Sequence, residues 1–233
     1  TTFCEALLGE MSDMVRVLFP ADHNSVLATL PAIYQARGQL ACMVIPKRER
    51  AAIFTQAQAE QLARDGAVLV EQLDGEEPLL LMACGSYQLA EMQRAAVRLR
   101  TAGLAYRLVY VQEPGRFRAP RDRWEAQALA SPEVVAQLFA PALRRRVLLT
   151  HMRPEVARGH LWPLLPDASN TVVLGYRNRG GTLDEAGMQF ANSATWAHIL
   201  DACAQLLQVP LSGVLSAAEI TAVKGEGDPR VLR

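Results

Sequence analysis

Short apolar runs alternate with segments of helical periodicity along most of the chain. Several of these runs, of which Leu79–Cys84 (LLLMAC) is the clearest, are apolar at every position, as strands buried on both faces of a parallel sheet are. Alternating strands and helices predict an α/β fold, in which right-handed crossovers connect parallel strands. The expected strands are residues 15–19, 40–45, 67–70, 79–84, 108–111, 147–150 and 171–174.

Residues that commonly cap helices mark the helix boundaries between these runs. Thr55 and Gly66 flank one helical segment as its N-cap and its C-terminal glycine. In the stretch FPADHNSVLA (residues 19–28), Asp22 can cap the next helix, because its carboxylate accepts N–H groups that a first turn leaves unpaired. Pro31 either kinks that helix or marks a later start. The expected helices are residues 24–37, 56–65, 87–101, 134–139 and 193–207.

A polar segment containing a glycine and a proline, residues 72–78 (QLDGEEP), separates two strand–helix series. We therefore expect one α/β layer in residues 1–72 and a second α/β domain in residues 73–233. The first layer holds about three strands, too few for an ordinary sheet of its own, so it needs strands supplied from elsewhere. The polar tail from Gly225 is expected to be frayed.

Composition excludes several classes of partner. A formal net charge of +0 at pH 7 gives no broad attraction to nucleic acid or to an anionic membrane. No apolar run approaches the ~20 residues that a membrane span needs. The four cysteines are far apart and form no CxxC pair, which indicates a reducing compartment, and we expect the cytoplasm. Because the chain begins at Thr1, we expect a processed product, a fragment or one piece of a longer polypeptide.

Lys47 and Arg48 are the first candidates for ligand binding. They follow an apolar run and Pro46, at the carboxyl end of an expected strand. Ligands of open α/β sheets bind in the crevice at the carboxyl ends of the strands, and a lysine there can hold a phosphate as a point charge. Residue type alone favours the alternative, a solvated basic turn.

Two polar motifs have simpler interpretations than catalysis. Asp22, His23 and Asn24 resemble catalytic or metal-binding residues, but consecutive side chains point in different directions, so we expect a helix cap. Cys84 precedes Gly85 at a strand end and could be a nucleophile on a sharp turn. No base can be assigned to it, which favours a tight turn. The sequence contains no P-loop, dinucleotide fingerprint, Ser-His-Asp arrangement or zinc spacing.

The later part of the chain carries further polar candidates. His151 follows one expected strand, and the loop GYRNRGG (residues 175–181) follows the next, so both lie at one edge of the sheet. The two arginines of that loop could grip an anion or simply face solvent. Asn192 and His198 come near the last helix. His198 falls within an apolar period, which is more typical of a buried, hydrogen-bonded histidine than of a ligand.

Together these residues resemble the C-terminal part of the phosphoketolases, a thiamine-diphosphate family of the transketolase superfamily. The similarity extends from about residue 3 to about residue 207, and the order and ungapped spacing of the motifs are its most specific feature. The family pattern R-V-x-x-P-x-D-x-N is matched by Arg16, Val17, Pro20, Asp22 and Asn24, and the family's lysine by Lys47. The later patterns are matched by His151, Gly175, Tyr176, Gly180, Thr182, Asn192 and His198.

The resemblance implies a fold and a reaction. Residues 1–72 would end a pyrimidine-binding-type parallel sheet layer, and residues 73–233 would form a transketolase-type C-terminal α/β domain that supports homodimer assembly. Lys47 would contact the substrate phosphate, with help from Arg48. The complete enzyme would use thiamine diphosphate and Mg²⁺ to cleave a ketose phosphate with inorganic phosphate, giving acetyl phosphate and an aldose phosphate.

The chain also departs from the family pattern. The glutamate that activates the cofactor, a His-Asn motif and the whole diphosphate-binding domain lie outside it, so we expect no catalytic or metal-binding residue here. We expect no activity without the missing N-terminal part or subunit. The family's acidic residues after Tyr176 are replaced by Asn178 and Arg179, which is compatible with divergent specificity or lost activity. A transketolase part, or a non-catalytic assembly or regulatory module, remains the alternative.

Overall fold

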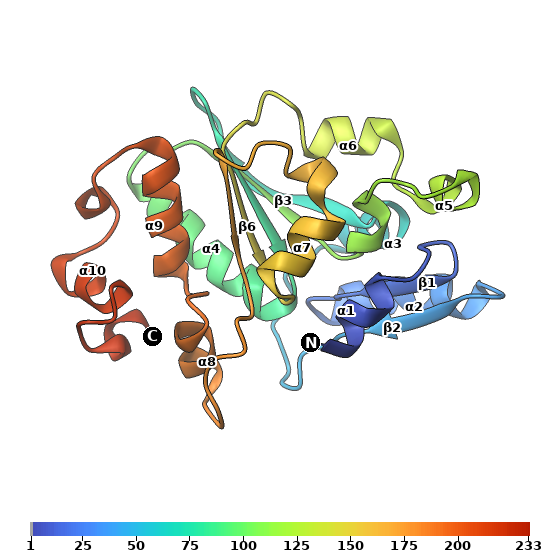
Figure 1. Ribbon diagram of the computed structural model, residues 1–233, viewed down its shortest axis with the longest axis horizontal. Coiled ribbons are helices and arrows are strands. Elements are labelled where there is room, and N and C mark those ends of the chain that lie inside the picture. The colour runs from blue at the N-terminus through green and yellow to red at the C-terminus, as the bar shows by residue number, and fades with distance from the viewer. Residues whose placement is uncertain (1) are drawn as a thin grey trace.

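The strands form two sheets in the computed structural model, which describes residues 2–233 (Figure 1). In the smaller sheet, β1 (Val15–Leu18) pairs in parallel with β2 (Leu40–Met43), and α2 (His23–Gln35) connects them. The larger sheet is five-stranded, with the order β3-β5-β4-β6-β7. Its members are β3 (Ala67–Leu73), β4 (Leu79–Cys84), β5 (Tyr106–Val111), β6 (Arg146–Thr150) and β7 (Thr171–Leu174). The predicted α/β class is confirmed, and every expected strand is present.

The strand β3 corrects two expectations. It pairs with β5 in the antiparallel sense, so the larger sheet is mixed, and it does not belong to the layer of β1 and β2. Residues 74–78 are too few for the crossover of a dozen or more residues that a parallel connection requires. The polar segment predicted as a domain boundary is therefore a short connection within one sheet, and the division at residue 72 stays a prediction.

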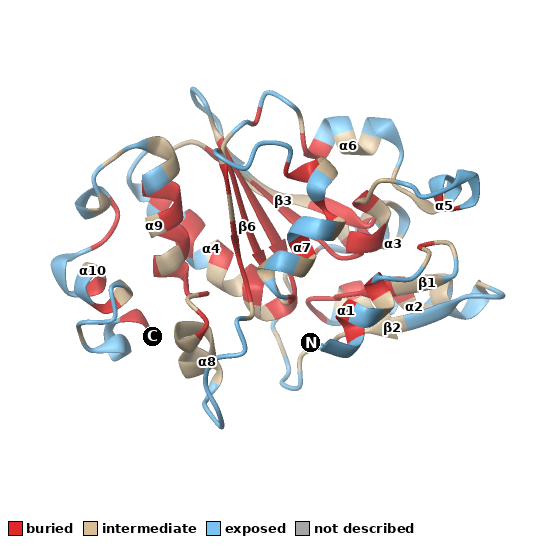
Figure 2. Cartoon of the chain, in the orientation of Figure 1, coloured by how far each residue is buried: buried red, intermediate tan, exposed pale blue. Residues whose placement is uncertain are grey.

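Helices cover both faces of the larger sheet (Figure 1). One face packs against α4 (Ser86–Thr101), α9 (Trp196–Leu207) and α10 (Ala217–Val223), and the other against α1 (Thr2–Leu8), α6 (Pro132–Leu138) and α7 (Pro154–His160). Along β4, Leu79 and Leu81 join the first core and Leu80 and Met82 the second. All residues of β4 are buried, as its apolar sequence predicts, and Figure 2 shows the buried strands between the helices.

Local capping sets the helix boundaries where the sequence predicts it. Thr55 caps α3 (Gln56–Asp65), and Gly66 ends it with a φ of 82° in the left-handed region. The helix α2 begins at His23, so Pro31 lies inside it and does not mark a later start. The remaining short elements are η1 (Pro114–Phe117), α5 (Arg123–Ala128), η2 (Trp162–Leu164), α8 (Glu185–Ala191), η3 (Leu211–Gly213) and η4 (Pro229–Leu232).

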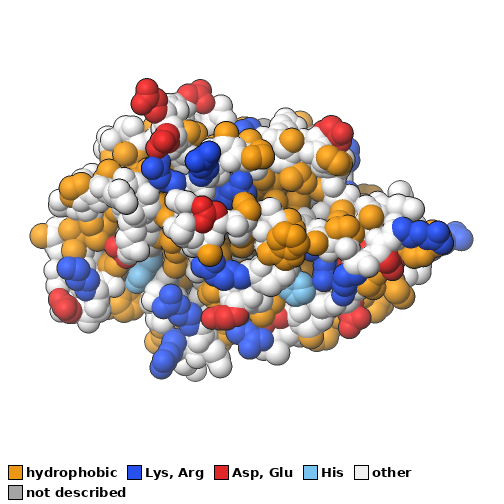
Figure 3. Space-filling model, turned by 45° about the horizontal axis from the view of Figure 1, so that its top comes forward, with side chains coloured by type: hydrophobic (Ala, Val, Ile, Leu, Met, Phe, Trp, Pro, Cys, Tyr) orange, Lys and Arg blue, Asp and Glu red, His pale blue; other side chains and the backbone are white. Residues whose placement is uncertain are grey.

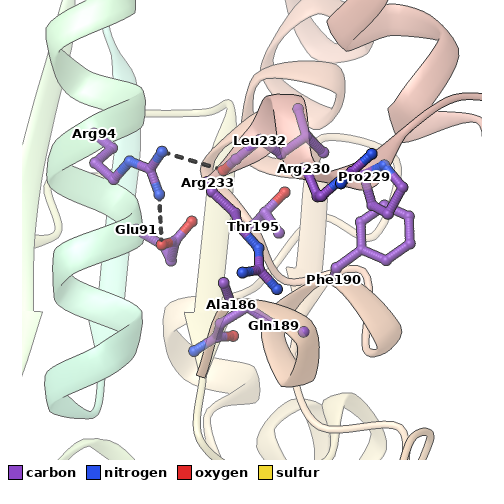
Figure 4. A pocket seen from close by; sticks show the side chains of 11 residues that line it. Glu91, Arg94, Ala186, Gln189, Phe190, Thr195, Pro229, Arg230, Leu232 and Arg233 are labelled. Carbon is purple, nitrogen blue, oxygen red and sulfur yellow. Dashed lines mark hydrogen bonds and ion pairs between the residues drawn. The ribbon is translucent and has the colours of Figure 1, made fainter. Parts of the chain in front are cut away.

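The C-terminal tail is packed, contrary to the expectation that it is frayed. Leu232 is buried, and its carbonyl oxygen accepts hydrogen bonds from Trp196 Nε1 at 2.9 Å and from Arg94 Nη2 at 3.1 Å. Figure 4 shows η4 beside α4 and α8 around a small pocket that includes Glu91. One apolar anchor and one shared carbonyl thus hold a segment whose sequence is mostly polar.

Basic side chains are spread among acidic and hydrophobic ones on the face shown in Figure 3. Within residues 2–233, no helix combines the length and the hydrophobicity that crossing a lipid bilayer requires.

Candidate substrate-binding edge

Residues that follow the strands of the larger sheet lie side by side at its carboxyl edge. The main-chain N–H of His151, after β6, donates to the carbonyl oxygen of Cys84, at the end of β4, at 2.8 Å. The N–H of Tyr176, after β7, donates to the carbonyl oxygen of Met152 at 3.0 Å. The structure therefore brings His151 and Tyr176 to neighbouring positions on this edge, where ligands of α/β sheets bind.

The smaller sheet meets the same edge through the residues after β1. The Ser86 hydroxyl, at the start of α4, donates to the carbonyl oxygen of Ala21 at 2.7 Å. The rings of Phe19 and His151 lie 5.7 Å apart between centroids, and Tyr110 donates its hydroxyl hydrogen to the Phe19 carbonyl oxygen. The carboxyl ends of strands from both sheets thus adjoin, which the sequence patterns did not predict.

Lys47 and Arg48 lie in the loop between β2 and α3, which we call the basic loop and define as residues 44–54. Both side chains are exposed, and neither forms an ion pair or hydrogen bond with another residue of the described range. Because β1 and β2 are parallel, this loop leaves the smaller sheet at the same end as Phe19. The two charges are therefore available to a ligand, and phosphate binding by them stays a prediction.

Arg50, which the sequence reasoning passed over, connects the basic loop to α4 and α8. Its Nη2 donates to Glu185 Oε1 of α8 at 2.6 Å, and its guanidinium carbon lies 4.3 Å from the centre of the Tyr87 ring on α4. The alternative of a solvated basic turn was weighed for Lys47 and Arg48 only, and Arg50 of the same run has a separate role. The run of charged residues 47–50 marks a candidate for ion pairing, but no nearby residue in the sequence indicates that Glu185 and Tyr87 are the partners of Arg50.

Asp22 caps α2, as predicted, and also holds the end of the basic loop. Its Oδ1 accepts from the N–H of Ser25 at 2.9 Å, and its Oδ2 accepts from the N–H groups of Ile53 at 2.7 Å and Phe54 at 2.9 Å. Burial alone would raise the pKa of this carboxyl, but these hydrogen bonds to the ionised form outweigh it and lower the pKa. The carboxylate is saturated by the protein and is not available as a base or metal ligand.

Asn24 completes this anchor, because its Nδ2 donates to the carbonyl oxygen of Phe54 at 2.8 Å. His23 between them is exposed. The two polar residues of the P-x-D-x-N pattern therefore position the segment that follows Lys47.

Arg16, the first residue of the same pattern, also has a structural role. It forms a two-point ion pair with Glu113, with Nε–Oε1 at 2.7 Å and Nη2–Oε2 at 2.8 Å. Glu113 is buried and follows β5, so the pair joins the two sheets. Hydrogen bonding to Glu113 raises the pKa of Arg16, which keeps the guanidinium charged.

His151 is half-buried at the edge, and no residue of the described range hydrogen-bonds to its ring nitrogens. Burial lowers the pKa of the imidazole, so the ring is neutral near pH 7 and offers one donor and one acceptor. These properties suit a ligand hydroxyl.

Tyr176 begins a loop that Asn192 fastens. Asn192 is buried; its Oδ1 accepts from the Arg177 N–H at 2.8 Å and its Nδ2 donates to the Arg179 carbonyl oxygen at 3.1 Å. The Tyr176 hydroxyl donates to Asn178 Oδ1 at 2.8 Å. Asn192 thus positions the loop after β7, and both loop arginines face solvent.

His198 lies half-buried in α9, where its Nδ1 is 2.7 Å from the Thr195 hydroxyl oxygen. Its ring lies 5.9 Å from the ring of Phe190. Burial lowers the pKa of His198 to about 4, so it is neutral near pH 7. This agrees with the interpretation of a hydrogen-bonded core histidine.

Cys84 is fully buried, and burial raises the pKa of its thiol, which opposes the nucleophile hypothesis. Across residues 2–233, no group of three or more His, Cys, Asp and Glu side chains could hold a metal ion. Residues 2–233 therefore offer no such cluster to a metal ion.

No family model matches the chain. In sequence it is 29% identical over 143 residues to a probable phosphoketolase of Lactococcus lactis subsp. lactis (strain IL1403), a match that covers 58% of this chain and 17% of that protein. The chain thus spans about a sixth of the length of this curated relative.

The structure is similar to a transketolase from Leishmania mexicana, with a TM-score of 0.64 and 14% identity over 92% of this chain and 28% of that one. It is also similar to a split-gene transketolase described as an inactive beta4 tetramer, with a TM-score of 0.61 and 16% identity over 84% of this chain and 58% of that one. The chain is therefore similar in sequence to a phosphoketolase over these 143 residues, and it has an α/β fold of the transketolase type.

Proposed function

We propose that this chain is the C-terminal part of a thiamine-diphosphate-dependent phosphoketolase, an aldehyde-lyase of carbohydrate metabolism. The complete enzyme would cleave a ketose phosphate with inorganic phosphate to give acetyl phosphate and an aldose phosphate. One observation carries the proposal: the basic loop presents Lys47 without a protein partner among the described residues, while Asp22, Asn24 and Arg50 hold the rest of the loop in place.

Lys47 would bind the sugar phosphate through its ammonium group, and Arg48 would add a second positive charge. A charge-assisted hydrogen bond to a phosphate oxygen contributes about 1.5–3 kcal/mol. His151 and Tyr176 would face the same edge, where a neutral imidazole and a phenol can exchange hydrogen bonds with sugar hydroxyl groups. Asn192 and His198 would not touch the substrate. Asn192 would hold the loop after β7, and His198 would hold the start of α9.

Thiamine diphosphate and Mg²⁺ would be held by residues outside this chain, and the cofactor would supply the carbon–carbon cleavage chemistry. The proposal therefore includes an N-terminal part or subunit, without which this chain is inactive. Homodimer assembly through residues 73–233 and a cytoplasmic location belong to the same proposal.

The test is acetyl phosphate formation by the complete protein with thiamine diphosphate, Mg²⁺, xylulose 5-phosphate and inorganic phosphate, followed by trapping as the hydroxamate. We expect product that depends on inorganic phosphate. Transfer of a two-carbon unit to an aldose phosphate without phosphate consumption would instead assign a transketolase part. The likeness to a split-gene transketolase favours a non-catalytic assembly module as the second candidate, and the absence of both reactions would select it.

A further inference from the structure

A cavity of about 680 Å³ lies at the amino end of β6, at the opposite end of that strand from His151. It opens on the face of the sheet that α6 and α7 cover, and its apolar walls include Val135, Phe139 and Leu164. The volume lies in the range of ligand cavities, ~300–1,000 Å³. The cavity shares no lining residue with the candidate substrate-binding edge.

A buried arginine forms part of this cavity. Arg146 is 3% exposed and forms no ion pair with a carboxylate of the described chain. Its Nε donates to the Leu143 carbonyl oxygen at 2.8 Å, its Nη1 to Leu164 at 2.6 Å, and its Nη2 to Phe139 at 3.2 Å and Ala140 at 3.3 Å. A guanidinium has five N–H donors, so one N–H on Nη1 is left over. Carbonyl oxygens satisfy the other donors but do not neutralise the charge.

Further polar groups lie near Arg146 and the cavity. Arg144 and Asn170 also line the cavity, and Arg144 is exposed at its mouth. Thr171, the register partner of Arg146 on β7, is not a lining residue, but its buried hydroxyl beside Arg146 has no hydrogen-bond partner among the described residues. One acid, Asp167, lines the rim, and its carboxylate accepts hydrogen bonds from Ser169. Two arginines against one acid leave a net positive charge.

The walls are also rigid. Four of the lining residues are prolines, whose fixed φ restricts the backbone of the cavity wall, namely Pro132, Pro141, Pro163 and Pro166. A preformed site binds without the cost of ordering its walls. Apolar, rigid walls around a cationic floor favour a ligand that has both an apolar body and a negative charge.

We propose that this cavity is a binding site for a small organic anion that carries one carboxylate, phosphate or sulfonate group on an apolar body. The anionic group meets Arg146 at the floor and Arg144 at the mouth, and the body packs against Val135, Phe139 and Leu164. The site is independent of the proposed enzymatic function, because it lies at the opposite end of β6.

A matched pair of dyes tests the proposal on the full chain. The dye 8-anilinonaphthalene-1-sulfonate has the required chemistry, and N-phenyl-1-naphthylamine is the same ring system without the sulfonate. We expect the sulfonate dye to bind with increased fluorescence and about 10-fold or more tighter than the neutral dye, since a charged hydrogen bond contributes that much.

Three variants locate the binding. Ala136 is exposed at the cavity wall, so A136W fills the mouth without altering the core and is expected to abolish binding of both dyes. R144Q is expected to weaken the sulfonate dye several-fold and to leave the neutral dye unchanged. R145Q is the matched control, because Arg145 pairs with Glu77 and does not line this cavity. Far-ultraviolet circular dichroism and thermal melting check that each variant is folded.

Each result of the dye experiment either supports or contradicts the proposed site. Equal affinity for the two dyes, or equal effects of R144Q and R145Q, would overturn the anionic class. Full binding to folded A136W would place the dye elsewhere and overturn the site, as would no binding at all. If A136W does not fold, a crystal structure of the chain with the sulfonate dye decides: a sulfonate within hydrogen-bond distance of Arg146 Nη1 supports the site, and any other position overturns it.

Discussion

The carboxylate of Asp22 accepts a hydrogen bond from the main-chain N–H of Phe54 at 2.9 Å, across 32 residues of sequence. The other oxygen of the same carboxylate caps α2 at Ser25. One side chain thus fixes both the helix that crosses between β1 and β2 and the end of the loop that carries Lys47. Asp22 therefore has a structural role, although the run Asp22-His23-Asn24 resembles a catalytic group.

We expect D22N to destabilise the chain by about 1–3 kcal/mol, because an amide cannot accept all the hydrogen bonds that the carboxylate accepts. Urea unfolding followed by circular dichroism measures the loss. D74N, at an exposed position in the turn before β4, is the control and should change stability by no more than ~0.5 kcal/mol. Equal stability of D22N and D74N would show that the hydrogen bonds of Asp22 do not stabilise the fold.

The pair Arg16–Glu113 is expected to couple the two sheets. A double-mutant cycle with R16M and E113Q should give an interaction energy of about 2–3 kcal/mol, because both side chains are largely buried and joined at two points. The control cycle is Arg100–Glu71, whose side chains are 50% and 31% exposed, and it should give no more than ~1 kcal/mol. Indistinguishable coupling energies would contradict a special role for Arg16.

We expect protonation of Glu125 in acid to lower the free energy of unfolding. This carboxylate is fully buried, and although burial alone would raise its pKa, hydrogen bonds from Arg121 and from the Ser12 N–H lower it to about 2 from an ordinary 4.5. A depressed folded-state pKa stabilises the fold above pH 4.5, and that contribution is lost as the pH falls toward 2.

The measurement is the urea midpoint between pH 6 and pH 2 for the wild type and E125Q. We expect E125Q to be less stable by about 2–4 kcal/mol at pH 6 and to approach the wild type at low pH. A constant difference across the whole range would show that the ionised form has no special stabilisation.

Asn192 is expected to protect the loop after β7 from proteolysis. In N192A the N–H of Arg177 and the carbonyl of Arg179 lose their partner, so trypsin should cleave after these arginines several-fold faster. N170A, in another surface turn, is the control. Mass spectrometry of the first fragments identifies the cleavage site, and unchanged cleavage in N192A would argue against this anchoring.

Features with local causes could be predicted from the sequence. The helix start at Asp22 and the helix end at Gly66 depend on residues within one turn, and the strands are marked by their own apolar runs. The family pattern also points to His151 and Tyr176, which follow the ends of β6 and β7, and to Lys47, which lies in the loop after β2.

Features that depend on distant partners could not be predicted. The antiparallel pairing of β3 depends on β5, and the contacts of Arg50 depend on Tyr87 and Glu185. The packing of Leu232 depends on Trp196, and no periodicity near the C-terminus indicates it. Arg146 lies in a run of three arginines whose sequence does not distinguish the buried member from its two more exposed neighbours.

The most direct test of the central claim, that the basic loop binds the phosphate of the substrate, is the KM of the complete enzyme for xylulose 5-phosphate after K47A. Lys224 is the other lysine of the chain, so K224A is the matched control. We predict that K47A raises KM by about 10- to 100-fold with little change in kcat, because it removes a charge contact to the bound sugar phosphate, while K224A leaves both unchanged. An unchanged KM in K47A would contradict the account.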